Sequence, residues 1–218
     1  MHWLDPDRLP HVTSEVERFL VNPHGEADGI LLMNGMEVHF PPHLSPAVLA
    51  AINAGDRVTA HGVAPRTAAM MIAAVAIETS DGKRIVDNGP PKHDKHAKRA
   101  EAALPSPASK HQKLKVEGFV RRTLHGPRGE TRGALLDDGT IVRFPPHEAE
   151  ALAELLRPAS WLAARGDGLV TKIGTVIEAK EIGPSKDALR SLKPKKPKHD
   201  DPAKHAKDDG GHEYRTSA

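Results

Sequence analysis

Short apolar runs separated by turn-forming residues divide the first half of the chain into predicted strands. Residues 13–21 and 30–33 each form such a run. Val38 and Phe40 then alternate with polar neighbours, which is the period of two expected for a half-buried strand. The two prolines at 41–42 end that strand, because proline cannot donate a hydrogen bond to a β-ladder.

A helix is predicted directly after these prolines, followed by two more strands. Ser45 suits the N-cap and Pro46 the first helical position, and an apolar stretch follows over residues 47–52. Two further apolar runs, 57–63 and 70–77, predict strands joined by a loop that contains a proline. The predicted order is therefore three strands, one helix and two strands.

The same pattern occurs a second time in the chain. Residues 38–43, Val-His-Phe-Pro-Pro-His, return as Val-Arg-Phe-Pro-Pro-His at 142–147, 104 positions later. The copies align without a gap from about Val16 and Val120 to Gly62 and Gly166, with roughly four positions in ten identical. Asn34-Gly35, with Asp138-Gly139 in the second copy, suits a type I′ hairpin turn. A period of this length predicts two similarly folded units.

The predicted fold is mainly β, with two tandem five-stranded barrels and one helix between strands 3 and 4 of each. Five segments are expected: a loose lead at 1–11, a first barrel at 12–88, a linker at 89–115, a second barrel at 116–185 and a tail at 186–218. In the second barrel, an amphipathic helix is expected over about 148–156. The linker and tail are rich in Lys, Pro and His without apolar periodicity, so both are predicted to be disordered.

This order of elements resembles the OB-fold, a small Greek-key barrel. The Gly-Glu-x-x-Gly, Asp-Gly and Phe-Pro-Pro-His pattern is also similar to that of OB-type domains in uncharacterised bacterial proteins, although the first copy has Asn34 in place of the aspartate. The resemblance covers the two repeated units. It implies the barrel fold and a possible nucleic-acid role, and it carries no catalytic residues to this chain.

The composition of the chain bears on its cellular location and on the kinds of site it can form. The chain has 218 residues and no cysteine, which rules out disulfides and thiolate metal sites. Its first residues lack the basic and apolar regions of a signal peptide, and no apolar run approaches the ~20 residues of a membrane span. We therefore expect a cytoplasmic protein that does not bind membranes.

Positive charge is concentrated in the connecting segments. Residues 1–91 hold 6 Lys and Arg against 11 Asp and Glu, whereas residues 92–115 hold 7 against 2. Residues 116–185 hold 9 against 10, and residues 186–218 hold 9 against 6. Clustered lysines of this kind attract phosphates weakly and without regard to sequence.

Candidate nucleic-acid contacts follow from charge and from the repeat. Several histidines of the first copy align with arginines of the second, and both residue types can donate hydrogen bonds to anions. Phe119, on a predicted first strand, is a candidate platform for base stacking. The predicted contacts are Arg18, Arg122, Arg128, Arg143, Arg165, Phe119, Lys92, Lys95, Lys98, Arg99, Lys193, Lys195, Lys196 and Lys198.

The residues of the repeated motif have both structural and functional interpretations. Strand parity points Phe40 and Phe144 into the barrels, and Trp161 is placed at the start of a buried strand. His43 and His147 can cap the following helix or contact a ligand. A metal site from His24, His39, His43 and His61 would have no counterpart in the second copy, because arginine replaces three of the four. No metal or other cofactor is therefore predicted.

The sequence lacks the motifs of common enzyme classes. The chain has no glycine-rich phosphate loop, nucleophile elbow or HExxH sequence, so no catalytic residue is predicted. The leading hypothesis is a non-catalytic protein that binds single-stranded nucleic acid or another polyanion weakly. The alternatives are an adaptor that docks a protein partner on the barrels and, third, a histidine-based metal carrier.

Overall fold

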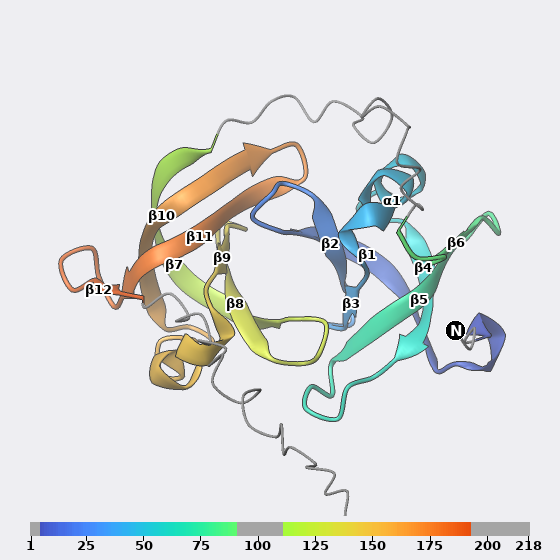
Figure 1. The fold of residues 1–218 in the computed structure, drawn as a ribbon, viewed down its shortest axis with the longest axis horizontal. Coiled ribbons are helices and arrows are strands. Elements are labelled where there is room, and N and C mark those ends of the chain that lie inside the picture. Colours follow the sequence, from blue (N-terminus) through green and yellow to red (C-terminus); the bar gives the residue numbers. More distant parts are fainter. Residues whose placement is uncertain (1–4, 91–110, 193–218) are drawn as a thin grey trace, which may run out of the picture.

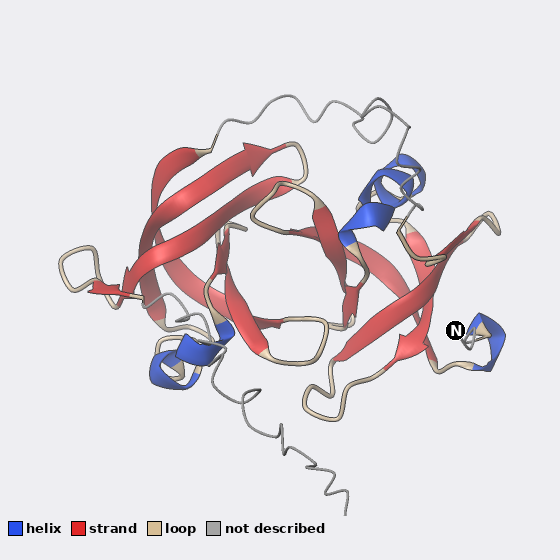
Figure 2. Cartoon of the chain, in the orientation of Figure 1, coloured by secondary structure: helices blue, strands red, loops and turns tan. Residues whose placement is uncertain are grey.

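Two β-barrels lie side by side in the computed structural model, which describes residues 5–90 and 111–192 (Figure 1). Strands dominate both units, and helical segments are short and peripheral (Figure 2). The predicted disorder of the linker and tail falls largely outside the described residues.

The first barrel closes in the strand order β1-β2-β3-β5-β4. Antiparallel ladders join successive neighbours, β3 and β5 pair in parallel, and β4 returns to β1. A sixth short strand, β6, extends the sheet beyond β5. The strands are β1 His11–Val21, β2 Ala27–Leu32, β3 Glu37–His39, β4 Arg57–Val63, β5 Met71–Thr79 and β6 Arg84–Val86. The helical segments are η1 Pro6–Arg8, η2 Pro42–Leu44 and α1 Ser45–Ala51.

The second barrel repeats this topology in the order β7-β8-β9-β11-β10, with β9 and β11 parallel and β12 appended to β11. Its strands are β7 Gln112–His125, β8 Thr131–Leu136, β9 Ile141–Arg143, β10 Trp161–Thr171, β11 Gly174–Gly183 and β12 Arg190–Ser191. Two 3-10 helices, η3 Pro146–Glu148 and η4 Glu150–Leu152, stand between β9 and β10. The predicted duplication of a five-stranded barrel is therefore confirmed.

Each barrel has its own apolar core. Phe40 packs with Val16, Ile30 and other buried residues in the first, and Phe144 packs with Val120 and others in the second. Both phenylalanines are buried, in agreement with the parity of their strands.

Three local predictions differ from the structure. The segment expected to form an α-helix in the second barrel is a series of 3-10 turns, and Ser45 Oγ accepts a hydrogen bond from the Ala27 amide (2.9 Å) instead of capping α1. The Asn34-Gly35 turn is not type I′, because only Gly35 has positive φ. It is instead a turn closed by the Gly35 amide on the Leu32 carbonyl, followed by a left-handed glycine.

The structured elements also extend past two predicted boundaries. β7 begins at Gln112, inside the predicted linker, because β10 supplies a full-length partner as far as Gly168. β12 lies inside the predicted tail and pairs with β11 at Ile182 and Glu181. Tertiary pairing thus orders polar residues that have no strand pattern of their own.

The repeated Gly62 and Gly166 occupy bulges where β4 meets β5 and where β10 meets β11. A Cβ at Gly62 would collide with the Ala73 carbonyl, and one at Gly166 would collide with the Glu178 carbonyl. Close backbone approach therefore explains glycine at both positions. Within the two described ranges, no helix combines the length and apolarity needed to span a membrane.

Candidate nucleic-acid interface

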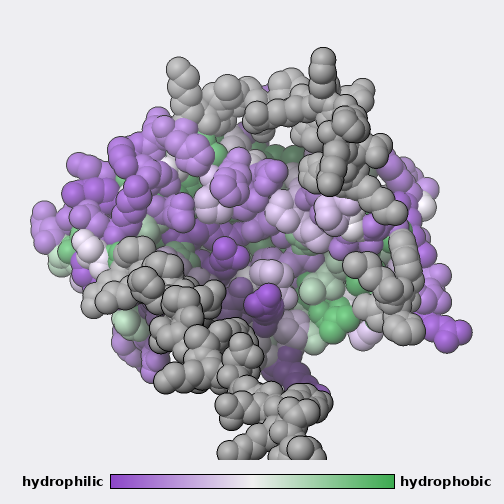
Figure 3. Space-filling model, viewed as in Figure 1, coloured by the Kyte–Doolittle hydropathy of each residue, from purple (hydrophilic) through white to green (hydrophobic). Residues whose placement is uncertain are grey.

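The face that OB barrels commonly present to ligands is buried between the two units. OB-folds bind oligonucleotides on strands 2 and 3 and on the loops that join strands 1–2 and 4–5. Here Leu31, Leu135 and Ile141 of these strands lie in a third apolar core between the barrels. Residues of β1, β7, β10 and β11 complete this core: Leu20, Val21, Leu124, Leu169 and Val176. The visible surface is mainly hydrophilic, in keeping with this internal burial (Figure 3).

The equivalent loops are also occupied by the opposite barrel. Gly25, in the β1–β2 loop, lies against Leu169 and Thr171 near the β10–β11 turn. Reciprocally, the Arg128 carbonyl in the β7–β8 loop accepts a hydrogen bond from Thr67 Oγ1 (3.2 Å) in the β4–β5 loop. Each barrel therefore covers both the strand face and the loops of its neighbour.

Contacts between the barrels are related by an approximate two-fold axis. Arg18 Nη1 donates to the Gly139 carbonyl (3.2 Å), and the equivalent Arg122 Nη2 donates to the Gly35 carbonyl (2.9 Å). Glu17 and Arg121, which are themselves equivalent positions, form an ion pair of 2.7 Å. Reciprocal contacts of this kind define an isologous arrangement, as in a two-fold dimer.

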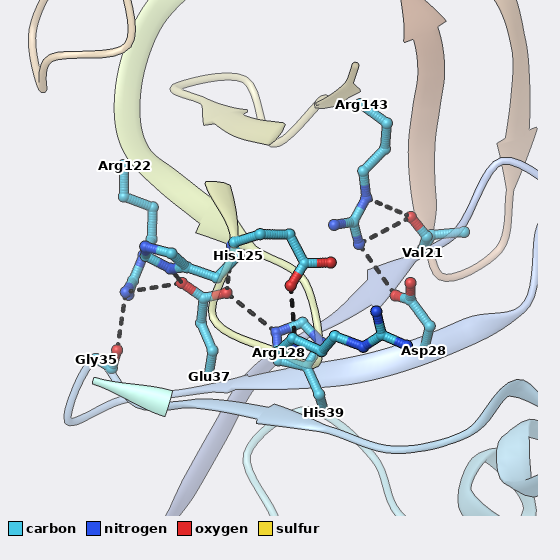
Figure 4. A network of polar contacts seen from close by, with 10 residues as sticks. Val21, Asp28, Gly35, Glu37, His39, Arg122, His125, Arg128 and Arg143 are labelled. Atoms are coloured by element: carbon cyan, nitrogen blue, oxygen red, sulfur yellow. Dashed lines mark hydrogen bonds and ion pairs between the residues drawn. The ribbon is translucent and has the colours of Figure 1, made fainter. Parts of the chain in front are cut away.

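A buried carboxylate breaks this symmetry on one side of the axis (Figure 4). Glu37 is 0% exposed, and its oxygens accept hydrogen bonds from the His125 amide (2.9 Å), His125 Nδ1 (2.9 Å) and His39 Nε2 (3.2 Å). Arg122 Nη2 lies 3.5 Å away. Burial, the largest effect, opposes ionisation, but hydrogen bonds from His125 and His39 and the charge of His125 together lower the pKa of Glu37 to about 2.

A second ion pair lies on the other side of the axis. Arg143, which is also buried, places Nη2 3.0 Å from Asp28 Oδ1 and directs its guanidinium toward the Val21 carbonyl (Figure 4). Its equivalent in the first barrel is His39, which contacts Glu37 of its own barrel. The interface is therefore symmetric in its backbone and asymmetric in its charges.

The predicted arginine contacts do not share one surface. Arg18, Arg122 and Arg143 point into the interface and are held by carbonyl or carboxylate oxygens. Arg165 lies on the outer face of the second barrel, 3.1 Å from Glu181. Arg128 is exposed in the β7–β8 loop. The predicted lysines and Arg99, namely Lys92, Lys95, Lys98, Arg99, Lys193, Lys195, Lys196 and Lys198, lie outside the described residues.

The histidines considered as metal ligands lie in separate environments. His39 contacts Glu37, His43 Nε2 contacts Asp87 Oδ1 (3.0 Å), and the His61 ring lies 5.5 Å from that of His11. Within residues 5–90 and 111–192, no group of three or more His, Asp or Glu side chains is arranged to hold a metal ion. The His43–Asp87 contact ties the repeated motif to the end of β6, and His147 lies in the equivalent 3-10 helix near Glu148 (3.9 Å).

The accessible face with features of a binding surface is the outside of β7 and β10. Phe119 and Trp161 are directly opposite each other on these strands and are 48% and 41% exposed. Their rings meet edge to face with centroids 4.8 Å apart. Trp161 begins a largely buried strand, as predicted, but its own side chain is exposed. The contact between Trp161 and Phe119 was not predicted, because it depends on the register between β7 and β10.

Basic side chains continue along the same two strands. Outward positions of β7 carry Lys113, Lys115 and Arg121, and Arg165 lies opposite Lys115 on β10. A groove of about 750 Å³ borders this face and is lined in part by Lys113, Arg165 and Lys180. Arg165 and Lys115 thus stand between the groove and the aromatic pair.

Acidic neighbours neutralise much of this positive charge. Asp167 lies 2.5 Å from both Lys113 and Lys180, and hydrogen bonds from these lysines lower its pKa to about 2. Glu117 similarly pairs with Lys186 at 2.6 Å. Lys115 has no ion pair with any described residue. The face is therefore aromatic and mixed in charge, with Lys115 as its uncommitted cation.

The architecture places the described units in the class of OB-type barrels, here fused as a pair. No protein-family model and no curated protein matches the sequence. Solved structures that are similar include the wild-type single-stranded DNA binding protein from Thermus aquaticus and a deletion mutant of it. The wild type is 13% identical over 86% of this chain and 94% of its own. The mutant is 12% identical over 85% and 96%. Both TM-scores are 0.26, too low to support a functional argument.

Proposed function

We propose that the protein binds single-stranded nucleic acid on the outer face of β7 and β10. The observation that carries the proposal is the exposed Phe119–Trp161 pair on a strand face that also bears Lys113 and Lys115. Bases stack on exposed aromatic rings without sequence preference, while nearby cations follow the backbone. This surface differs from the strand 2–3 face of OB-folds, which the neighbouring barrel covers.

The charge balance supports weak and salt-sensitive binding. Asp167, Glu117 and Glu181 already occupy most of the cations on the face. If about three phosphates are contacted, affinity for a single strand is expected to fall roughly 20-fold between about 50 and 200 mM salt. The lysines of the linker precede β7 in the sequence and would add further electrostatic attraction.

Tryptophan fluorescence tests the proposal at the site itself. The chain has two tryptophans, so a Trp3→Phe background leaves Trp161 as the sole reporter. Titration with short oligo-dT and oligo-rU at low salt is expected to quench Trp161, because a stacked base contacts the indole directly. An unchanged Trp161 spectrum at saturating oligonucleotide would refute binding on this face.

A pair of lysine variants separates local contact from general charge. Lys115→Ala removes the uncommitted cation beside the aromatic pair, whereas Lys172→Ala removes an exposed lysine in the β10–β11 turn. Both variants change the net charge equally. Lys115→Ala is expected to weaken oligonucleotide binding several-fold more than Lys172→Ala, and equal effects would indicate attraction without a defined site.

A protein-docking adaptor is the second candidate, and the same aromatic pair is the observation that favours it. Aromatic side chains are enriched in protein interfaces, and Phe119 and Trp161 are large and exposed. An adaptor predicts no response of Trp161 to oligonucleotides and no dependence of partner binding on the linker lysines. Deleting residues 92–110 therefore separates the two functions.

A further inference from the structure

The contacts between the two barrels differ in how well they would be kept if two copies of the same barrel were paired. Because the two copies are related by 104 positions, each observed contact between unlike barrels predicts what two like barrels would place at the same point. Two first barrels, or two second barrels, can be compared with the natural pair contact by contact. Three charged contacts discriminate between these pairings.

The first contact lies on the axis. Glu17 and Arg121 occupy equivalent positions and form an ion pair of 2.7 Å in the natural pairing. Two first barrels would bring Glu17 against Glu17, and two second barrels would bring Arg121 against Arg121. Either pairing replaces an attraction with a repulsion between like charges.

The second contact is the buried carboxylate. Glu37 accepts hydrogen bonds from the amide and ring of His125 in the natural pairing. The positions equivalent to His125 and Glu37 are Val21 and Ile141, which share the apolar core of the interface. Two first barrels would therefore place Val21 against Glu37 twice, so each carboxylate would lose the hydrogen bond and charge of the His125 ring while keeping His39 and an arginine equivalent to Arg122. Loss of one partner of a buried carboxylate is destabilising, because the oxygen it leaves cannot turn to water instead.

The third contact excludes pairs of second barrels. Arg143 Nη2 lies 3.0 Å from Asp28 Oδ1, and the position equivalent to Asp28 is Arg132. Two second barrels would place the buried Arg143 against Arg132 on both sides of the axis. His125 would also lose Glu37 and face Ile141.

The remaining contacts do not discriminate. Arg18 and Arg122 bind carbonyls of glycines that both barrels contain. Leu20, Leu31 and their equivalents Leu124 and Leu135 supply matching apolar surface from either barrel. Apolar area and backbone contacts thus contribute affinity for either barrel, while the charged contacts contribute specificity for the opposite barrel.

We propose that this surface is a heterotypic recognition surface, which binds a barrel of the opposite type and rejects a barrel of its own type. In the full chain the partner is the other barrel of the same molecule. A second copy can join on this surface only by exchange, so that each first barrel pairs with the second barrel of the other chain. Like-with-like association through these faces is disfavoured by the charged contacts.

The test begins with the folded full chain. A protease site placed within residues 91–110 is cleaved after folding, so both barrels have formed in their natural pairing. We expect the two pieces to remain together as a 1:1 complex with the mass of the intact protein by light scattering. Separation of the pieces, or their redistribution into pairs of like barrels, would overturn the proposal.

Exchange of pieces between cleaved molecules measures directly which barrel a first barrel binds. Cleaved protein tagged on the first barrel is incubated with untagged cleaved protein and then captured. The capture is expected to retain second barrels in equal amount and no untagged first barrel, which mass spectrometry distinguishes from the tagged one. Recovery of untagged first barrel would overturn heterotypic choice.

A relaxed variant and a matched control complete the design. Glu17→Gln with Glu37→Ile removes both features that forbid pairs of first barrels, since the introduced isoleucine would face Val21 within an apolar core that already holds Ile141. This variant is expected to capture untagged first barrel carrying the same changes. Glu15→Gln, at an exposed position of β1, the strand that also carries Glu17, is expected to behave as the unmodified protein. Identical capture by the relaxed variant and the control would contradict the idea that Glu17 and Glu37 prevent the pairing of two first barrels.

Discussion

Glu37 is expected to make folding stability depend on pH in a defined acidic window. Its pKa is about 2 in the folded protein against an ordinary value of 4.5. Because the folded-state pKa is lowered, the stabilisation is fully present above pH 4.5 and is lost as the pH falls toward 2. A shift of this size corresponds to about 3 kcal/mol of unfolding free energy.

The perturbation is Glu37→Gln, which keeps the shape of the side chain and removes its charge. Denaturant unfolding is measured for both proteins from about pH 5 to about pH 3, below the usual titration range of histidine. Over this interval the stability advantage of the unmodified protein is expected to shrink by about 2 kcal/mol. Taking the difference between the two proteins removes the contributions of other carboxylates.

A constant difference between the two proteins across this interval would refute the interpretation of Glu37 as an ionised, buried carboxylate. Glu15→Gln, an exposed acid of β1, serves as the control and is expected to give a curve parallel to that of the unmodified protein. A further variant, Glu37→Ile with His125→Val, copies the Val21–Ile141 arrangement. It is expected to recover most of the stability that Glu37→Ile alone loses, because the apolar side chain then meets an apolar partner.

Three further predictions concern the interface, the bulge and the outer face. Leu135→Ala, in the core between the barrels, is expected to lower the unfolding free energy by about 2–5 kcal/mol, more than the partly buried Leu155→Ala, as measured by urea denaturation. Gly166→Ala is expected to cost about 2 kcal/mol in the same assay, because its Cβ would strike the Glu178 carbonyl; unchanged stability would contradict the bulge. Phe119→Ala with Trp161→Ala is expected to weaken oligonucleotide binding at least tenfold in fluorescence anisotropy, and unaltered affinity would count against base stacking there.

The barrels themselves were predictable because their signals are local and doubled. Three features of the sequence together indicated the order of the strands. Apolar and polar residues alternate around Val38 and Phe40, glycines mark the turns, and the repeat has a constant spacing. Their cores contain the residues that strand parity selects. The α-helix expected in the second barrel failed because its apolar positions also satisfy 3-10 turns, which bury Leu152 and Leu156 equally well.

The interface between the barrels was not predicted, although a signal for it exists. Leu31 and Leu32 are adjacent in β2, as Leu135 and Leu136 are in β8, so both faces of each strand are apolar. Such continuous runs are typical of strands buried on both sides. The charged contacts could not be inferred in the same way. Arg143 faces Asp28 only because of how two folded units meet, and no local pattern records that orientation.

The approximate two-fold axis at Glu17 and Arg121 has a consequence for any directional polymer that crosses it. The outer faces of β1 and β7 are related by rotation, so a strand running from one to the other meets the second face in the opposite direction. Nucleic acid has chemically distinct 5′ and 3′ ends. It cannot make the same contacts on both faces, so duplication of the barrel need not duplicate the binding site.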